Sequence, residues 1–124
     1  MVQEHVLETI DSRELKVYAV WEPILRTDDE RSSRKATMFF PDDRVKNYWT
    51  STQDVGKAFQ HPLDLTTEPA WDVYLLYAPQ AKWVTGQPPP RPDFYMHQLG
   101  GRLPDGATLD GPGLASEVRR VLSR

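Results

Sequence analysis

Two apolar runs constrain the fold most strongly, because each has apolar residues on both sides of an extended chain. Leu15–Trp21 is interrupted only by Lys16, and Trp71–Ala78 carries one charged residue, Asp72. Successive side chains of a strand point to opposite faces, so both faces of each run would be apolar. Such strands lie inside a sheet that is covered on two sides. The runs therefore predict two inner strands of a layered α/β protein.

The rest of the chain supplies further elements. Apolar residues recur at three- and four-residue steps after Pro41-Asp42-Asp43, which predicts a helix ended by His61-Pro62. Short strands are expected at 36–40 and 94–99, and a second helix begins at Asp110 or Gly111. The segments between them are predicted to be a solvated charged loop (27–35), a stiff proline link (87–92) and a turn around Asp105-Gly106 (103–109).

Element order and length indicate a single domain. The chain has 124 residues, which fits one compact core. Residues 1–13 are expected to form an N-terminal arm or a short amphipathic helix, followed by a domain over 14–124. Within that domain a strand–helix–strand unit precedes two strands and a closing helix. That order predicts a three-layer α/β fold with a mixed sheet of about four strands and helices on both faces.

The composition excludes several classes of chemistry. The chain has no cysteine, so it can form no disulfide, thiolate nucleophile or cysteine-ligated metal site. The three histidines are scattered singly, and no metal or other cofactor is expected. A net charge of −3 argues against a general nucleic-acid binder, and no apolar stretch approaches bilayer length. No secretory signal is visible, so a cytoplasmic location without membrane partners is expected.

The element order resembles the thioredoxin fold over roughly residues 14–123. Val20-Trp21 followed by Glu22-Pro23-Ile24-Leu25 stands where that family has Trp-Cys-x-x-Cys, and Arg91-Pro92 stands where it has a cis-proline. Three further segments are similar to those of small bacterial thioredoxin-like proteins: Asp43–Trp49, Trp71–Tyr74 and Phe94–Leu99. Because both redox positions lack cysteine, the resemblance implies a thioredoxin-like domain that is not a dithiol oxidoreductase.

The candidate site is a groove between the loop over Trp21–Arg26 and the segment Arg91-Pro92-Asp93, with His97 as a further candidate binding residue. Trp21 would form its floor, Glu22 and Arg26 its polar handles, and the backbone beside Pro92 an edge for pairing. A protein, a peptide or a small ligand would bind there, and a homodimer is an open alternative. Trp83 lies in a polar segment and is expected to be an exposed contact residue.

A small enzyme is the competing hypothesis. It would use Glu22 with His97, or Asp72, for acid–base chemistry on a substrate that the sequence does not identify. The opposite reading of His97 is a hydrogen-bonded structural side chain inside a strand. The tract Pro88–Pro92 likewise has two readings, a rigid connector or a polyproline ligand oriented by Arg91.

Overall fold

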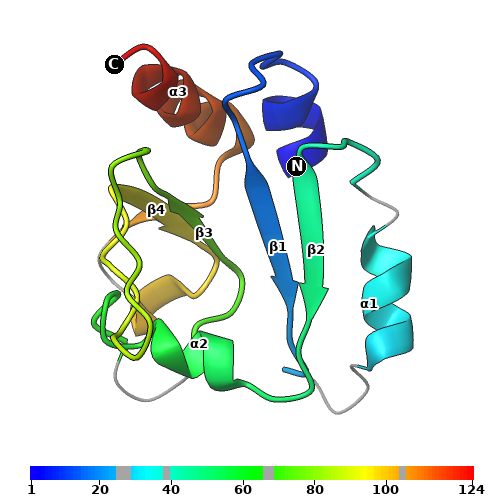
Figure 1. Cartoon of the computed structure of the whole chain (residues 1–124), viewed down its shortest axis with the longest axis vertical. Coiled ribbons are helices and arrows are strands. Elements are labelled where there is room, and N and C mark those ends of the chain that lie inside the picture. Colours follow the sequence, from blue (N-terminus) through cyan, green and yellow to red (C-terminus); the bar gives the residue numbers. More distant parts are fainter. Residues whose placement is uncertain (25–28, 38–39, 66–68, 104–105) are drawn as a thin grey trace. The chain divides into compact units, whose positions relative to one another are not determined.

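The computed structural model describes residues 1–24, 29–37, 40–65, 69–103 and 106–124. The chain is α/β, as the sequence predicted, and its strands form a two-stranded and a three-stranded sheet (Figure 1). The elements in chain order are η1 (Gln3–Leu7), β1 (Val17–Trp21), α1 (Glu30–Thr37), β2 (Val45–Trp49), α2 (Asp54–Ala58), β3 (Val73–Leu76), β4 (Phe94–His97), η2 (Gly100–Arg102), β5 (Ala107–Thr108) and α3 (Gly111–Leu122).

The chain divides into two compact units. The first unit holds residues 1–53 together with 111–124, and the second holds residues 54–110. The three-stranded sheet lies within the second unit, and the two-stranded sheet lies within the first. Each unit is described by itself below.

Strands β1 and β2 of the first unit are parallel neighbours. Their register runs from Val17 opposite Val45 to Trp21 opposite Trp49, and Figure 1 shows them side by side. The ladder continues beyond β1, because the Thr50 amide donates to the Trp21 carbonyl over 3.0 Å. Parallel neighbours require a crossover connection, and α1 lies in that connection and contacts β2.

The charged segment 27–35, expected to be a loop, is in part helical. Residues 25–28 lie outside the described part, and α1 begins at Glu30. The carboxylate of Asp29 accepts a hydrogen bond from the Ser32 amide (2.7 Å), which is the geometry of an N-cap. Arg34 and Lys35 lie in the last turn, where cations favour the negative end of the helix dipole. A helix can therefore form here without an apolar face.

The expected strand over 36–40 is wrong where the structure describes it. Residues 36 and 37 belong to α1, residues 38 and 39 lie outside the described part, and Phe40 is not in a strand. The sequence predicted no helix here, but α1 runs from Glu30 through Thr37 and so includes the first residues of the expected strand.

The long helix expected after Asp43 is also wrong. This stretch contains the strand β2, a turn at residues 50–53 and the short helix α2. Val45 and Trp49 fit a helical step of four as well as a strand step of two. Branched and aromatic residues favour strands, and the hydrogen bonds to β1 decide in favour of the strand.

The amino-terminal segment is part of the first unit. Residues Gln3–Leu7 form a short helix of the π type, and η1 packs against α3. The spacing of the sequence predicts a buried α3 stripe of Leu114, Val118, Val121 and Leu122; the first three are buried and Leu122 is half-buried. Val6, Leu7 and Ile10 of the N-terminal segment are also buried. Gly111, the first residue of α3, lies so close to the His5 ring that a Cβ atom there would overlap it.

The second unit is built on a strand pair that the sequence predicted. Strands β3 and β4 are antiparallel, from Val73 opposite His97 to Leu76 opposite Phe94. The short strand β5 pairs in parallel with β4, at a place where only a turn was expected. The buried cluster of this unit consists of Leu63, Leu65, Ala70, Tyr95, Leu99 and Leu103. Apolar side chains from loops as well as strands therefore form its core.

Candidate functional site

The residues predicted for the groove fall in both units. Trp21 and Glu22 lie in the first unit, whereas Arg91, Pro92 and His97 lie in the second. Arg26 lies outside the described residues. Each described residue has its contacts within its own unit as follows.

Trp21 is half-buried at the carboxyl end of β1. Its indole Nε1 donates a hydrogen bond to Oδ1 of Asn47 on the neighbouring strand over 3.0 Å. The ring also contacts Phe40, with centroids 6.2 Å apart. A buried tryptophan usually has its N–H satisfied in this way. The indole is thus fixed in orientation, and its remaining exposed part is a rigid apolar surface at the end of the sheet.

The loop after Trp21 is held to the loop after β2. The Gln53 side-chain amide donates to the Pro23 carbonyl over 3.1 Å, and the Ile24 amide donates to the Glu22 carbonyl over 3.0 Å. Glu22, the first residue after β1, is half-buried. The carboxyl ends of two parallel strands and their following loops therefore form one connected edge. Ligands of α/β sheets bind at such edges.

Arg91 and Pro92 have structural partners in the second unit. The Arg91 guanidinium forms an exposed ion pair with Asp64 (3.1 Å) and also donates to the Pro62 carbonyl (3.3 Å). Pro92 is buried, and the Arg91–Pro92 peptide bond is trans. The cis bond that the resemblance implies at this position is absent. These contacts agree with the connector reading of the proline tract.

His97 is buried in β4, with 3% of its surface exposed. Its Nδ1 accepts a hydrogen bond from the Leu99 amide over 3.1 Å, so the neutral ring carries its proton on Nε2. This arrangement is typical of a structural histidine. Neither of the two surface hollows described below is lined by His97.

Asp72 belongs to a polar cluster at the start of β3. It has a left-handed backbone (φ 53°), and its carboxylate faces the side-chain amide of Gln98, at 2.8 and 3.1 Å with the amide NH₂ oriented toward it. The Tyr74 hydroxyl is 3.5 Å from the same carboxylate. Burial, with a smaller contribution from Asp72, raises the pKa of Tyr74. The cluster links the start of β3 to the end of β4, which lie at the same end of the antiparallel pair.

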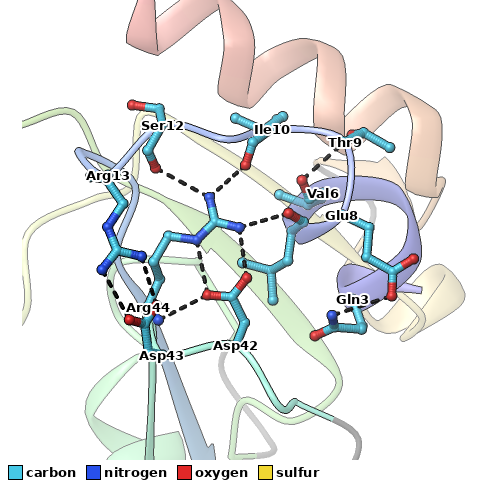
Figure 2. A network of polar contacts seen from close by, with 11 residues as sticks. Gln3, Val6, Glu8, Thr9, Ile10, Ser12, Arg13, Asp42, Asp43 and Arg44 are labelled. Carbon is cyan, nitrogen blue, oxygen red and sulfur yellow. Dashed lines mark hydrogen bonds and ion pairs between the residues drawn. The ribbon is translucent and has the colours of Figure 1, made fainter.

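The most highly connected polar side chain was not predicted from the sequence. Arg44 is 7% exposed, and its guanidinium donates to both Asp42 oxygens and to the carbonyls of Leu7, Ile10 and Ser12 (Figure 2). The hydrogen bonds from Arg44 lower the pKa of Asp42 to about 2. This network holds the N-terminal segment to the start of β2. The Asp-x-Arg spacing was its only signal in the sequence.

One face of the β1–β2 pair was expected to be covered and is not. Tyr18 is 62% exposed and Tyr48 is 49% exposed, and their rings stack with centroids 6.4 Å apart. Val20 is exposed beside them, and Lys46 lies directly opposite Tyr18. The two-sided apolar pattern of 15–21 concealed this, because it predicts burial on both faces.

Among the described residues of the second unit, Pro88 and Pro89 line two shallow surface hollows. One has a volume of about 360 Å³ and the other about 300 Å³. The larger is also lined by His61, Pro62, Asp64 and Arg91, and the smaller by residues 83–87. The proline tract is visible in the sequence, but nothing in the sequence indicates that these side chains meet at it.

Trp83 is exposed, as the sequence predicted, with 56% of its surface accessible. Its ring contacts Phe59 and Tyr77, at centroid distances of 6.1 and 5.0 Å. The Tyr77 hydroxyl donates to the Pro90 carbonyl over 2.8 Å, and burial, with a smaller effect of Asp93, raises the pKa of Tyr77 to about 12. Aromatic contacts thus anchor the irregular segment 79–90 to the end of β3.

Within the described ranges, no three His, Asp or Glu side chains are grouped so that they would hold a metal ion. No helix in that part of the chain has the length and apolar character needed to cross a membrane. No protein-family model, curated protein or solved structure matches the chain.

Proposed function

We propose that this chain is a redox-inactive thioredoxin-like domain that binds a protein, peptide or small ligand at the loop after Trp21. In this proposal the strands belong to one mixed sheet with helices on both faces, and Tyr18 and Tyr48 lie on a part of that sheet that is left exposed. The element order supports the assignment, because a parallel β1–α1–β2 unit is followed by α2, an antiparallel strand pair and a closing helix. In this proposal α1, which the sequence did not predict, is the helix that connects β1 to β2.

The carboxyl edge of the β1–β2 pair is the observation that carries the binding proposal. Trp21 and Trp49 end their strands in register, and the two following loops are joined by the hydrogen bond from Gln53 to Pro23. In this proposal the half-buried indole of Trp21 provides an apolar contact, and the carboxyl group of the next residue, Glu22, provides a hydrogen-bond acceptor. Glu22 stands where thioredoxins have the first redox cysteine, so in this proposal the edge has a carboxyl group in place of a thiol.

A peptide library tests the site. Phage-displayed random peptides are selected on the immobilised full chain, and the affinities of selected peptides are then measured by fluorescence anisotropy. Glu22→Ala and Trp21→Phe are the test variants, because the first removes the carboxylate and the second removes the indole N–H while keeping a ring. We expect both to weaken binding, and we expect Glu22→Gln to have a smaller effect than Glu22→Ala.

Val84→Ala is the control, since it removes an exposed apolar side chain from the other unit. Circular dichroism verifies that each variant is folded. Selected peptides that bind wild type, Glu22→Ala and Trp21→Phe equally would contradict the site. The fold assignment has its own test, because amide–amide NOEs that join the two sheets into one would support it and their absence would contradict it.

The enzyme hypothesis has less support from the described contacts. One ring nitrogen of His97 already accepts the Leu99 amide, and the ring is buried. Glu22 lies at a loop edge rather than in one of the two described hollows. A general base requires a reachable proton in a substrate pose, and neither residue lines an enclosed pocket here. Binding is therefore the function that this geometry favours.

A further inference from the structure

The exposed face of the β1–β2 pair carries aromatic and basic side chains together. Tyr18 and Tyr48 come from neighbouring strands, and their rings are inclined by only 26°. Lys46 is opposite Tyr18, and Val20 is opposite Tyr48, so the four side chains form one patch. Exposed Lys16 precedes β1 by one residue. The term aromatic platform is used below for Tyr18, Val20, Lys46 and Tyr48.

The opposite face of the same sheet has different surroundings. Trp21 and Asn47 point to that side, where Phe40 from the α1–β2 connection contacts the Trp21 ring. The residues of that face are half-buried, whereas those of the aromatic platform are exposed. The first unit thus leaves two large aromatic rings in solvent on one side only.

The shape and size of the platform restrict its occupant. Small molecules bind in concave sites, and both described hollows are lined by residues of the other unit. A second copy of the chain needs about 800 Å² on each partner for a stable interface. An aromatic residue buries roughly 150–250 Å², so the exposed parts of the platform offer roughly 300 Å². That area is insufficient for a dimer.

The geometry of the platform also distinguishes between an extended peptide and a nucleic acid as the occupant. Extended peptides add to a sheet at its edge, through main-chain hydrogen bonds. The platform is a face, and it presents ring surfaces with a cation beside them. Exposed aromatic side chains on neighbouring strands stack unpaired bases in sheet-based RNA-binding modules, and lysines neutralise the phosphates between those bases.

We infer that the aromatic platform binds single-stranded nucleic acid, with bases stacked on Tyr18 and Tyr48 and the backbone phosphate near Lys46. This departs from the expectation drawn from the net charge. Residues 1–53 and 111–124 contain eleven basic and eleven acidic side chains, so the entire excess of three negative charges belongs to residues 54–110. The unit that carries the platform therefore has no net charge, so the negative charge of the whole chain does not oppose phosphate binding at Lys46.

Fluorescence anisotropy with the full chain provides the test. The probe is a labelled oligouridylate of about twelve nucleotides, which spans a typical single-strand site. Because each stacked base contributes about 1–3 kcal/mol, Tyr18→Ala and Tyr48→Ala should each weaken binding by about 5-fold or more. Tyr18→Phe should retain most of the affinity, since the ring remains. Lys46→Gln should reduce the slope of log K against log salt by about 0.7.

Three controls make the result specific. Val84→Ala removes an exposed apolar side chain of the other unit and should leave the affinity unchanged. A duplex of the same length should bind more weakly than the single strand, because its bases are not available for stacking. Both tyrosines are exposed, so their substitution should leave the circular dichroism spectrum unchanged.

Several results would overturn the inference. These are the absence of saturable binding, equal affinity for the duplex, or an unchanged affinity in both Tyr→Ala variants. Binding of labelled polyglutamate with the same loss in those variants would assign the platform to acidic peptides instead. The inference uses a different surface from the Trp21 edge, so either proposal can fail while the other holds.

Discussion

Arg44 and Asp42 are two residues apart and form a two-point ion pair inside the first unit. Nε of Arg44 donates to Oδ1 of Asp42 over 2.9 Å, and Nη2 donates to Oδ2 over 2.7 Å. The three remaining N–H groups donate to the carbonyls of Leu7, Ile10 and Ser12, so all five donors of the guanidinium are satisfied. A buried cation is tolerated when it is paired and fully hydrogen-bonded in this way.

Replacement of Arg44 should destabilise the chain strongly. Arg44→Ala leaves the Leu7 and Ile10 carbonyls and the Asp42 carboxylate without their donor, and loss of one partner of a buried ion pair costs about 3–5 kcal/mol. Arg44→Lys should restore only part of the stability, because an ammonium group has three donors rather than five. Urea unfolding followed by circular dichroism measures both effects.

Arg13→Ala is the matched control for that experiment. Arg13 also forms a two-point pair with an aspartate, Asp43, at 2.7 and 2.9 Å, but both side chains are exposed. Exposed pairs contribute little to stability because solvent screens them. If Arg13→Ala destabilised the chain as much as Arg44→Ala, burial would not explain the role of Arg44.

The Arg44–Asp42 pair should make stability depend on acid pH. Hydrogen bonds from Arg44 lower the pKa of Asp42 from 3.8 to about 2 in the folded chain. A carboxyl whose pKa is lower when folded stabilises the folded state above its unfolded pKa, and that contribution is lost as protons bind. We expect the loss between about pH 4 and pH 2. The stability difference between wild type and Asp42→Asn should shrink over that interval, as urea midpoints would show.

Gly106 should not tolerate a side chain. Its φ is +86°, which L-residues disfavour by roughly 1–2 kcal/mol, and a Cβ atom there would overlap the ring of Tyr95. Gly106→Ala should therefore lower the free energy of unfolding by more than the backbone term alone. Gly101→Ala is the control, because its backbone lacks a positive φ and nothing lies within 4 Å of the added atom. Equal thermal midpoints for the two variants would contradict this packing.

Tyr77 should control stability at alkaline pH. Burial raises its pKa from 10.0 to about 12, so the folded state resists ionisation of this phenol. A group with a raised folded pKa stabilises the folded state below its unfolded pKa, and the contribution is lost as pH rises toward the folded value. Wild type should lose stability between about pH 10 and 12. Tyr77→Phe should lose less, although it also lacks the hydrogen bond to Pro90.

Sequence reasoning located part of the candidate site. It predicted that Trp21 ends a strand and that Trp83 is exposed, and both predictions are confirmed. It placed Tyr18 on a covered face, which is wrong, because an apolar run on both faces does not reveal which face lacks a covering layer. The relation of Trp21 to Arg91 stays a prediction.

The sequence by itself determined four elements and one exclusion. Dense apolar runs produced β1, β3 and β4, the spacing of Leu114, Val118 and Val121 produced α3, and the absence of cysteine excludes dithiol chemistry. Tertiary structure alone decided that Val45–Trp49 is a strand and that Arg44 is buried. The physical reason is that a strand obtains its hydrogen bonds from a distant partner, here β1, and Arg44 obtains three of its acceptors from residues 7–12. The periodicity of a local segment gives no information about these distant partners.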